Sequence, residues 1–128
     1  MSARFLSPLA LLLACAPAPP VPPGQAPADL VGTWEVDLRP TPAAPAYTQT
    51  FTVTRVEGRG FEGSFYDTPL RDGRINVDWG ALHFAFVTSD DSGVYHHAGS
   101  MTADGLHGTS HSLGRGFLAV WTARRVGR

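Results

Sequence analysis

The chain has 128 residues, a length typical of one domain. Its 10 basic side chains are all arginine and nearly balance 11 acidic ones, and because the charges are scattered, they exclude a basic patch for nucleic acid. Cys15 is the only cysteine, which excludes an intrachain disulfide.

The first 14 residues predict a secretory signal peptide. Arg4 precedes an apolar run, residues 5–13, that is too short to cross a membrane as a helix. The stretch 12–15, Leu-Leu-Ala-Cys, resembles the lipobox of bacterial lipoproteins. That resemblance implies cleavage before Cys15, a lipid on its sulfur and a membrane-anchored protein of the cell envelope. The alternative is an ordinary signal cleaved near Ala18, with Cys15 discarded.

Residues 15–29 predict a tether between the anchor and a domain over 30–128. Five prolines lie between Pro17 and Pro23, and they favour an extended, semi-rigid segment without a hydrogen-bond ladder. Ala16, directly after the cysteine, resembles lipoproteins sent to an outer membrane, on its periplasmic side, if the cell has one.

The domain alternates apolar and polar residues with a period of two, which predicts strands bounded by Gly, Pro, Asp or Asn. No segment after residue 14 repeats its apolar residues with the 3.6-residue period of an α-helix. We expect eight strands, over residues 31–38, 47–56, 61–66, 74–78 (starting as early as Leu70), 81–88, 93–101, 106–112 and 116–125.

Short connections favour an all-β, up-and-down antiparallel barrel over a Greek-key sandwich, which usually needs long crossovers. Only the loop 40–45 is longer than a hairpin turn. Barrel closure also removes the edge strands that a secreted monomer would have to protect. Eight strands leave room for packed side chains or for one small ligand.

The segment Gly32-Thr33-Trp34, which opens the first strand, resembles the Gly-x-Trp of lipocalins and related calycins. The resemblance implies a tryptophan at the closed end of the barrel with an arginine of the last strand across it. Arg125 is in phase with Trp121 for that contact, and Arg124 is the alternative if the strand has the other phase. Gly32, Trp34 and Arg125 are therefore the expected structural residues.

A ring of aromatic side chains should face the interior, where it either fills the core or lines an apolar pocket. His97 shares this face with Tyr95 and Ser110 and could orient the polar end of a ligand. The expected ligand-contacting residues are Trp34, Phe51, Phe65, Trp79, Phe84, Phe86, Tyr95, His97, Met101, Ser110, Phe117 and Trp121.

Catalysis is not expected at His97, because no acid is assigned to it and no strained elbow presents a serine nucleophile. No cofactor is expected either. The turn of residues 90–93 lacks the acidic spacing of a calcium loop and predicts a hairpin.

Three further histidines, His83, His96 and His111, should lie on neighbouring strands of the outer wall, with His111 opposite either Ala98 or His96, depending on the hairpin at Asp104-Gly105. Three imidazoles could bind zinc or copper. Solvated wall histidines are the simpler interpretation, because the strands carry no ligand-spacing motif and no carboxylates to orient the rings.

The sequence thus predicts an envelope lipoprotein that binds a small apolar ligand without catalysis. The alternative is an envelope interaction or inhibitor module with a solid barrel core and a protein partner.

Overall fold

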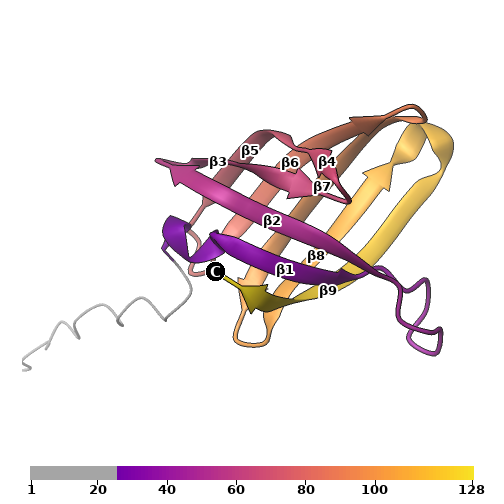
Figure 1. Cartoon of the computed structure of the whole chain (residues 1–128), viewed down its shortest axis with the longest axis horizontal. Coiled ribbons are helices and arrows are strands. Elements are labelled where there is room, and N and C mark those ends of the chain that lie inside the picture. Colours follow the sequence, from indigo (N-terminus) through magenta and orange to yellow (C-terminus); the bar gives the residue numbers. More distant parts are fainter. Residues whose placement is uncertain (1–25) are drawn as a thin grey trace, which may run out of the picture.

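The computed structural model describes residues 26–128, so the predicted signal peptide, Cys15 and most of the tether lie outside the described residues. The described chain folds into one closed antiparallel β-barrel (Figure 1). Its strands are β1 (Gly32–Asp37), β2 (Thr48–Glu57), β3 (Gly60–Phe65), β4 (Thr68–Pro69), β5 (Arg71–Asn76), β6 (His83–Asp90), β7 (Gly93–Thr102), β8 (Gly105–Ser112) and β9 (Phe117–Gly127).

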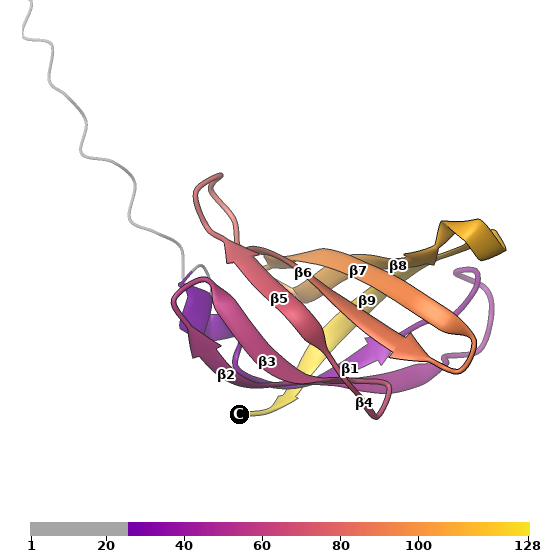
Figure 2. The same ribbon diagram turned by 90° about the horizontal axis from the view of Figure 1, so that it is seen from above.

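Apart from the short β4, each strand pairs with its neighbours along the chain, and the first strand pairs with the last. The order is β2-β1-β9-β8-β7-β6-β5-β3-β4, and a β2–β3 ladder closes the ring. Eight strands form the wall, while β4 is a two-residue strand beside β3. Figure 2 shows how the curved sheet brings β1, β2 and β3 opposite β6, β7 and β8. The predicted all-β, up-and-down barrel is confirmed.

Two short 3-10 helices complete the fold: η1 (Pro27–Leu30) precedes β1, and η2 (Leu113–Arg115) joins β8 to β9. The wall strands match the predicted ones to within a few residues. β5 begins at Arg71, close to the earlier start expected at Leu70, and ends at Asn76, two residues before the predicted end. The Asn76 side chain accepts a hydrogen bond from the Asp78 backbone N–H at 2.8 Å. This local turn ends the strand even though the alternating pattern continues.

That early end removes Trp79 from the barrel interior, where the alternation had placed it. Trp79 is 83% exposed in the loop between β5 and β6. The prediction that Trp79 faces the barrel interior is therefore wrong. The period of two predicts a face only as long as the strand itself continues.

One end of the barrel is closed by Trp34 and Arg125. The Arg125 guanidinium carbon lies 4.2 Å from the Trp34 ring centre, and the same guanidinium donates hydrogen bonds to the backbone oxygens of Val31 (2.7 Å) and Asp29. The Trp34 indole N–H donates to the Leu30 carbonyl at 3.0 Å. The contact expected between the first and last strands is present, with Arg125 rather than Arg124.

Gly32 makes this arrangement possible. Its φ is +141°, and a Cβ there would lie 2.5 Å from the Arg125 guanidinium and 2.6 Å from the Gly127 carbonyl. Any other residue would displace the arginine from the tryptophan. Steric crowding thus explains why a glycine occupies the first position of the Gly-x-Trp segment.

The middle of the barrel is filled by phenylalanines. Phe51 stacks on Phe86 with ring centres 5.0 Å apart, and Phe61, Phe65 and Phe84 surround this pair. These phenylalanines and Trp34 share one buried core cluster with the following apolar side chains: Leu30, Val36, Val53, Ile75, Leu82, Met101, Leu106 and Ala123. The interior is therefore packed from the closed end to the layer of Phe86.

Candidate functional site

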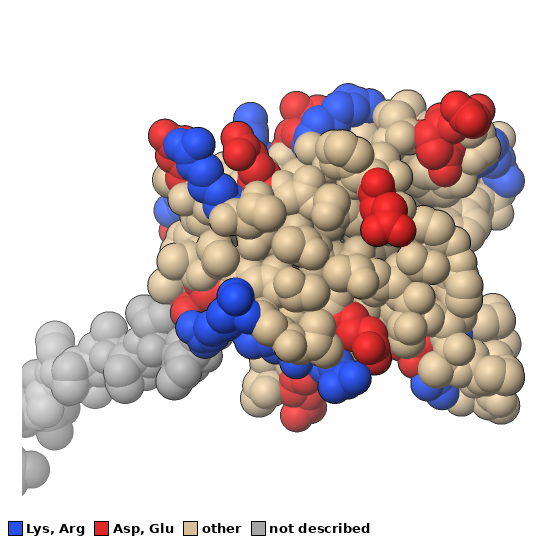
Figure 3. Space-filling model, in the orientation of Figure 1, with Lys and Arg blue, Asp and Glu red and all other residues tan. Residues whose placement is uncertain are grey.

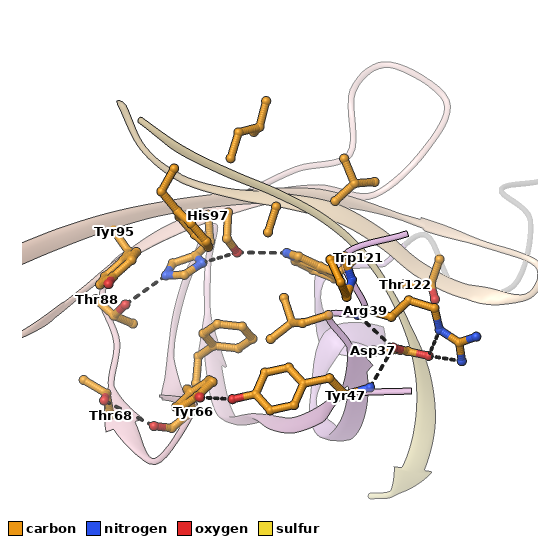
Figure 4. A pocket seen from close by; sticks show the side chains of 18 of the residues that line it. Asp37, Arg39, Tyr47, Tyr66, Thr68, Thr88, Tyr95, His97, Trp121 and Thr122 are labelled. Carbon is orange, nitrogen blue, oxygen red and sulfur yellow. Dashed lines mark hydrogen bonds and ion pairs between the residues drawn. The ribbon is translucent and has the colours of Figure 1, made fainter. Parts of the chain in front are cut away.

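The opposite end of the barrel holds a cavity of about 740 Å³ (Figure 4). Its lining comes from the ends of β1, β3 and β6, from β7 and β8, from the first half of β9, and from the loop after β1. All these strands reach the cavity at the same end because the ring is a simple meander. Phe65 and Trp121 form its apolar sides, and His97 lies at its base beside Phe86.

A chain of hydrogen bonds crosses the base of the cavity, and Figure 4 shows it running from Thr88 through His97 to Trp121. The Thr88 hydroxyl lies 2.9 Å from His97 Nε2, and the Ser110 hydroxyl lies 2.6 Å from His97 Nδ1. The Trp121 indole N–H donates to Ser110 Oγ at 2.9 Å. All four side chains line the cavity, so this base is polar but internally bonded.

His97 is held in its neutral form. It is 4% exposed, it stacks on Phe86 with ring centres 4.5 Å apart, and Phe65 meets it at 4.7 Å. Burial lowers the pKa of His97 from 6.5 to about 4, helped by the nearby imidazoles of His111 and His96. At neutral pH the base of the cavity therefore carries no charge from this residue.

The rim is polar, and two of its charged residues, Asp37 and Arg39, pair with each other. The Asp37 carboxylate accepts hydrogen bonds from the Arg39 guanidinium at 2.6 and 2.8 Å, and these bonds lower the pKa of Asp37 to about 2. The Tyr47 and Tyr66 hydroxyls form a short hydrogen bond across the mouth, which raises the pKa of Tyr66 (Figure 4).

The far side of the rim carries Tyr95, whose hydroxyl lies 3.2 Å from Ser92 Oγ and whose ring lies 4.6 Å below the Arg115 guanidinium carbon. Hydrogen bonds from Ser92 and Arg115 lower the pKa of Tyr95. Figure 3 shows arginine and acidic side chains intermingled around the margins of the face that it views.

The cavity also opens sideways, along β9. The β1–β9 ladder ends at Asp37–Thr122, and within residues 26–128 the stretch 117–121 pairs only with β8. β1 does not extend farther, because Leu38 bonds to Tyr47 and Pro40 follows. The lining therefore includes outward-facing Leu118 and Val120 as well as inward-facing Trp121.

The cavity divides the predicted ligand-contacting residues into groups. Half of them line it: Phe65, Tyr95, His97, Ser110, Phe117 and Trp121. Five others are buried in the packed part instead: Trp34, Phe51, Phe84, Phe86 and Met101. As described above, Trp79 lies in an exposed loop.

Several lining residues were missed by the sequence-based set. Thr88 continues the inward face of Phe84 and Phe86, so its phase could have identified it. Arg39, Tyr47 and Tyr66 also reach the rim. Tyr47 and Tyr66 were expected as the terminal residues of strands 47–56 and 61–66, but they lie just outside β2 and β3, where alternation no longer defines a face. The backbone of Tyr66 is left-handed (φ +56°), a conformation that the sequence did not indicate.

The outer-wall histidines do not come together as a group of three. His96 and His111 are directly opposite and stack with ring centres 5.5 Å apart, which corresponds to one of the two expected registers. His83 instead lies opposite Ser100, four residues along β6 from Val87, the partner of His96. The prediction that the three lie close together is wrong, and residues 26–128 contain no cluster of three or more His, Cys, Asp or Glu side chains suited to a metal ion.

The turn between β6 and β7 is a hairpin, as predicted. Asp90 pairs with Gly93, and the Asp90 carboxylate accepts hydrogen bonds from the Ser92 backbone N–H (2.8 Å) and hydroxyl (2.6 Å), which lower the pKa of Asp90. These local bonds account for the geometry of the turn without a cation.

Along the described chain, no helix has the length and apolar character that a membrane crossing requires. Comparisons with models of protein families, with curated proteins and with solved structures find no match to this chain.

Proposed function

We propose that the barrel is lipocalin-like in function and binds one small, largely apolar molecule in the cavity at its open end. The observation that carries this proposal is a cavity of about 740 Å³ with aromatic sides and one polar base. Pockets for small molecules typically span about 300 to 1,000 Å³ and combine apolar walls with a few fixed polar groups. An interior that is packed over one half and hollow over the other fits a binding protein better than a solid module.

The proposed activity is binding without catalysis. His97 is bonded to hydroxyl groups on both ring nitrogens, and neither partner is a carboxylate. A histidine with a pKa of about 4 is also a weak base at neutral pH.

We further propose that the protein is a lipoprotein of the cell envelope, anchored through Cys15. The Leu-Leu-Ala-Cys segment supports this proposal, and the proline-rich stretch after it would hold the barrel away from the membrane. Metabolic labelling with a radioactive fatty acid should mark the wild-type protein and not Cys15→Ser. Equal labelling of the wild-type protein and the variant would contradict a lipid anchor at Cys15.

The binding proposal is tested on full-length protein extracted from its own cells in mild detergent. Native mass spectrometry should reveal a bound molecule in addition to the polypeptide, and a small, uncharged apolar compound such as 9-fluorenone should raise the melting temperature. A ligand at a concentration a hundred times its Kd stabilises the folded protein by about 2.7 kcal/mol. For a domain of this size, that stabilisation raises the melting temperature by several degrees. Bare polypeptide mass together with an unchanged melting temperature would count against the proposal.

A matched pair of variants locates the site. Ala119 lines the cavity, whereas Ala85 is exposed on the outer wall of β6. Ala119→Phe should reduce the gain in melting temperature, because the added ring occupies part of the cavity. Ala85→Phe adds the same ring outside and should leave the gain unchanged.

An envelope interaction module is the second candidate function. The exposed apolar side chains of β9, Leu118 (63% exposed) and Val120 (69%), favour it. A photo-crosslinker at Leu118 should then capture one partner in cells, while the same group at exposed Glu62 should not. Equal capture at the two positions would exclude a specific partner surface on β9.

A further inference from the structure

The hydrogen-bond chain at the base of the cavity contains more donors than it uses. Trp121, Ser110, neutral His97 and Thr88 each contribute one polar hydrogen, and three contacts join them. Four hydrogens and three bonds leave one hydrogen over.

Which group donates and which accepts at each hydrogen bond decides where this hydrogen lies. The Trp121 N–H can only donate, so Ser110 Oγ accepts from it. If Ser110 then donates to His97 Nδ1, His97 Nε2–H donates to Thr88, and the Thr88 hydroxyl hydrogen is left. If His97 carries its proton on Nδ1, Thr88 donates to Nε2, and the Ser110 hydroxyl hydrogen is left. Both tautomers leave one O–H donor.

No described protein group takes up this donor. Within residues 26–128, Thr88 Oγ1 is bonded only to His97, and Ser110 Oγ is bonded only to His97 and Trp121. Thr88 and Ser110 both line the cavity, so we take the remaining O–H to be available to a molecule inside it.

The charge of the site restricts the partner further. Thr88, His97, Ser110 and Trp121 are neutral side chains at neutral pH, and the Arg39 guanidinium at the rim is already bonded to Asp37. A carboxylate or an ammonium group placed at the base would therefore be buried without a counter-charge, which is unfavourable.

We infer that the ligand of the cavity carries an uncharged acceptor oxygen, of the ketone, quinone, ester or ether type, that receives a hydrogen bond from Thr88 or Ser110. This inference rests on the proposed function, since it concerns the ligand of the same cavity. A purely hydrocarbon molecule at the base would leave the O–H unpaired and would bind less tightly.

Matched probes test the inference. Fluorene and 9-fluorenone share one tricyclic skeleton and differ by the ketone oxygen, and their affinities for the full-length protein can be measured by equilibrium dialysis. 9-Fluorenone should bind roughly fivefold more tightly than fluorene, the gain of one net hydrogen bond. The charged 9-fluorenecarboxylate should bind more weakly than 9-fluorenone.

Infrared spectroscopy gives a direct readout. The carbonyl band of bound 9-fluorenone should lie at lower frequency than in an alkane, because the oxygen accepts a hydrogen bond. The double variant T88V/S110A removes both hydroxyls, so the band should move back and the advantage of the ketone should disappear. An unchanged affinity for fluorene shows that this variant keeps its cavity, and if it does not fold, the wild-type comparison still decides.

The outcomes separate the two proposals. Equal binding of fluorene and 9-fluorenone, an unshifted carbonyl band, or tighter binding of the carboxylate overturns the inference and leaves the binding function standing. Failure of all three compounds to bind, together with an empty native mass spectrum, overturns both.

Discussion

His97 is the residue at which the packed and hollow parts of the barrel meet. Its ring stacks on Phe86 on one side, and its nitrogens hold Thr88 and Ser110 at the base of the cavity. The sequence predicted that it faces inward, because it is in phase with the apolar Met101 on the same strand. Its neutral state depends on burial, which is a property of the assembled barrel rather than of the local pattern.

The depressed pKa of His97 predicts a pH dependence of stability. The unfolded chain binds a proton at this residue below about pH 6.5, whereas the folded chain does so only below about pH 4. The free energy of unfolding should therefore fall as the pH drops through this window, by about 3 kcal/mol from this group. Below pH 4 both states are protonated, and the group causes no further loss.

Urea unfolding of wild type and His97→Gln between pH 4 and 7.5 measures this contribution. The difference in pH dependence between the two proteins should equal the His97 contribution, since other titrating groups are common to both. His83→Gln, on the exposed wall of β6, serves as the control and should behave like wild type. Parallel pH profiles for wild type and His97→Gln would show that His97 is not buried in its neutral form.

At the scale of elements, β9 links the two ends of the barrel. Its first half lines the cavity through Phe117 and Trp121, and its last half completes the ring through Arg125. Trp121 packs over Gly108, where a Cβ would lie 2.3 Å from the indole ring, so a glycine on β8 makes room for it.

Adjacent arginines on β9 provide a test of the closed end. Arg125→Ala removes the contact with Trp34 and two hydrogen bonds to backbone oxygens, and it should destabilise the protein by about 2 kcal/mol. Arg124→Ala removes only an exposed pair with Glu35 and should cost less than about 1 kcal/mol. Chemical denaturation of both variants at neutral pH checks the difference, and equal losses would contradict a structural role for Arg125.

The elements were largely predictable because the chain is a meander of short strands. A period of two identifies a strand and its inward face, and short connections leave few ways to arrange eight strands. The pattern did not predict where β5 ends, because that depends on the Asn76 side chain and on a bidentate pair between Arg59 and Asp78. Trp79 was misplaced for this reason.

At the scale of the whole molecule, one half of the barrel provides stability and the other provides space. The sequence could not show which aromatic residues belong to the packed half and which to the hollow half, because all inward aromatic residues share the same phase along their strands. Which of them touch each other depends on their height along the barrel axis. Phe51 and Phe86 lie at neighbouring heights and stack, whereas Phe117 lies at the mouth and is 41% exposed.

This division predicts unequal costs for two similar substitutions. Phe51→Ala leaves a hole in the packed half and should cost about 3 to 5 kcal/mol. Phe117→Ala at the rim should cost less than about 1 kcal/mol. Denaturant titrations of the two variants measure the costs, and similar values would mean that the aromatic residues form one uniform core.

The most direct test of a ligand site at the open end is a map of backbone amide chemical shifts during titration with 9-fluorenone. The shifts should concentrate at cavity residues such as Phe65, Thr88, Ala119 and Trp121, and they should be absent at Val53 and Leu106 in the packed half. Shifts confined to the outer wall, or spread evenly over both halves, would contradict a binding site inside the barrel.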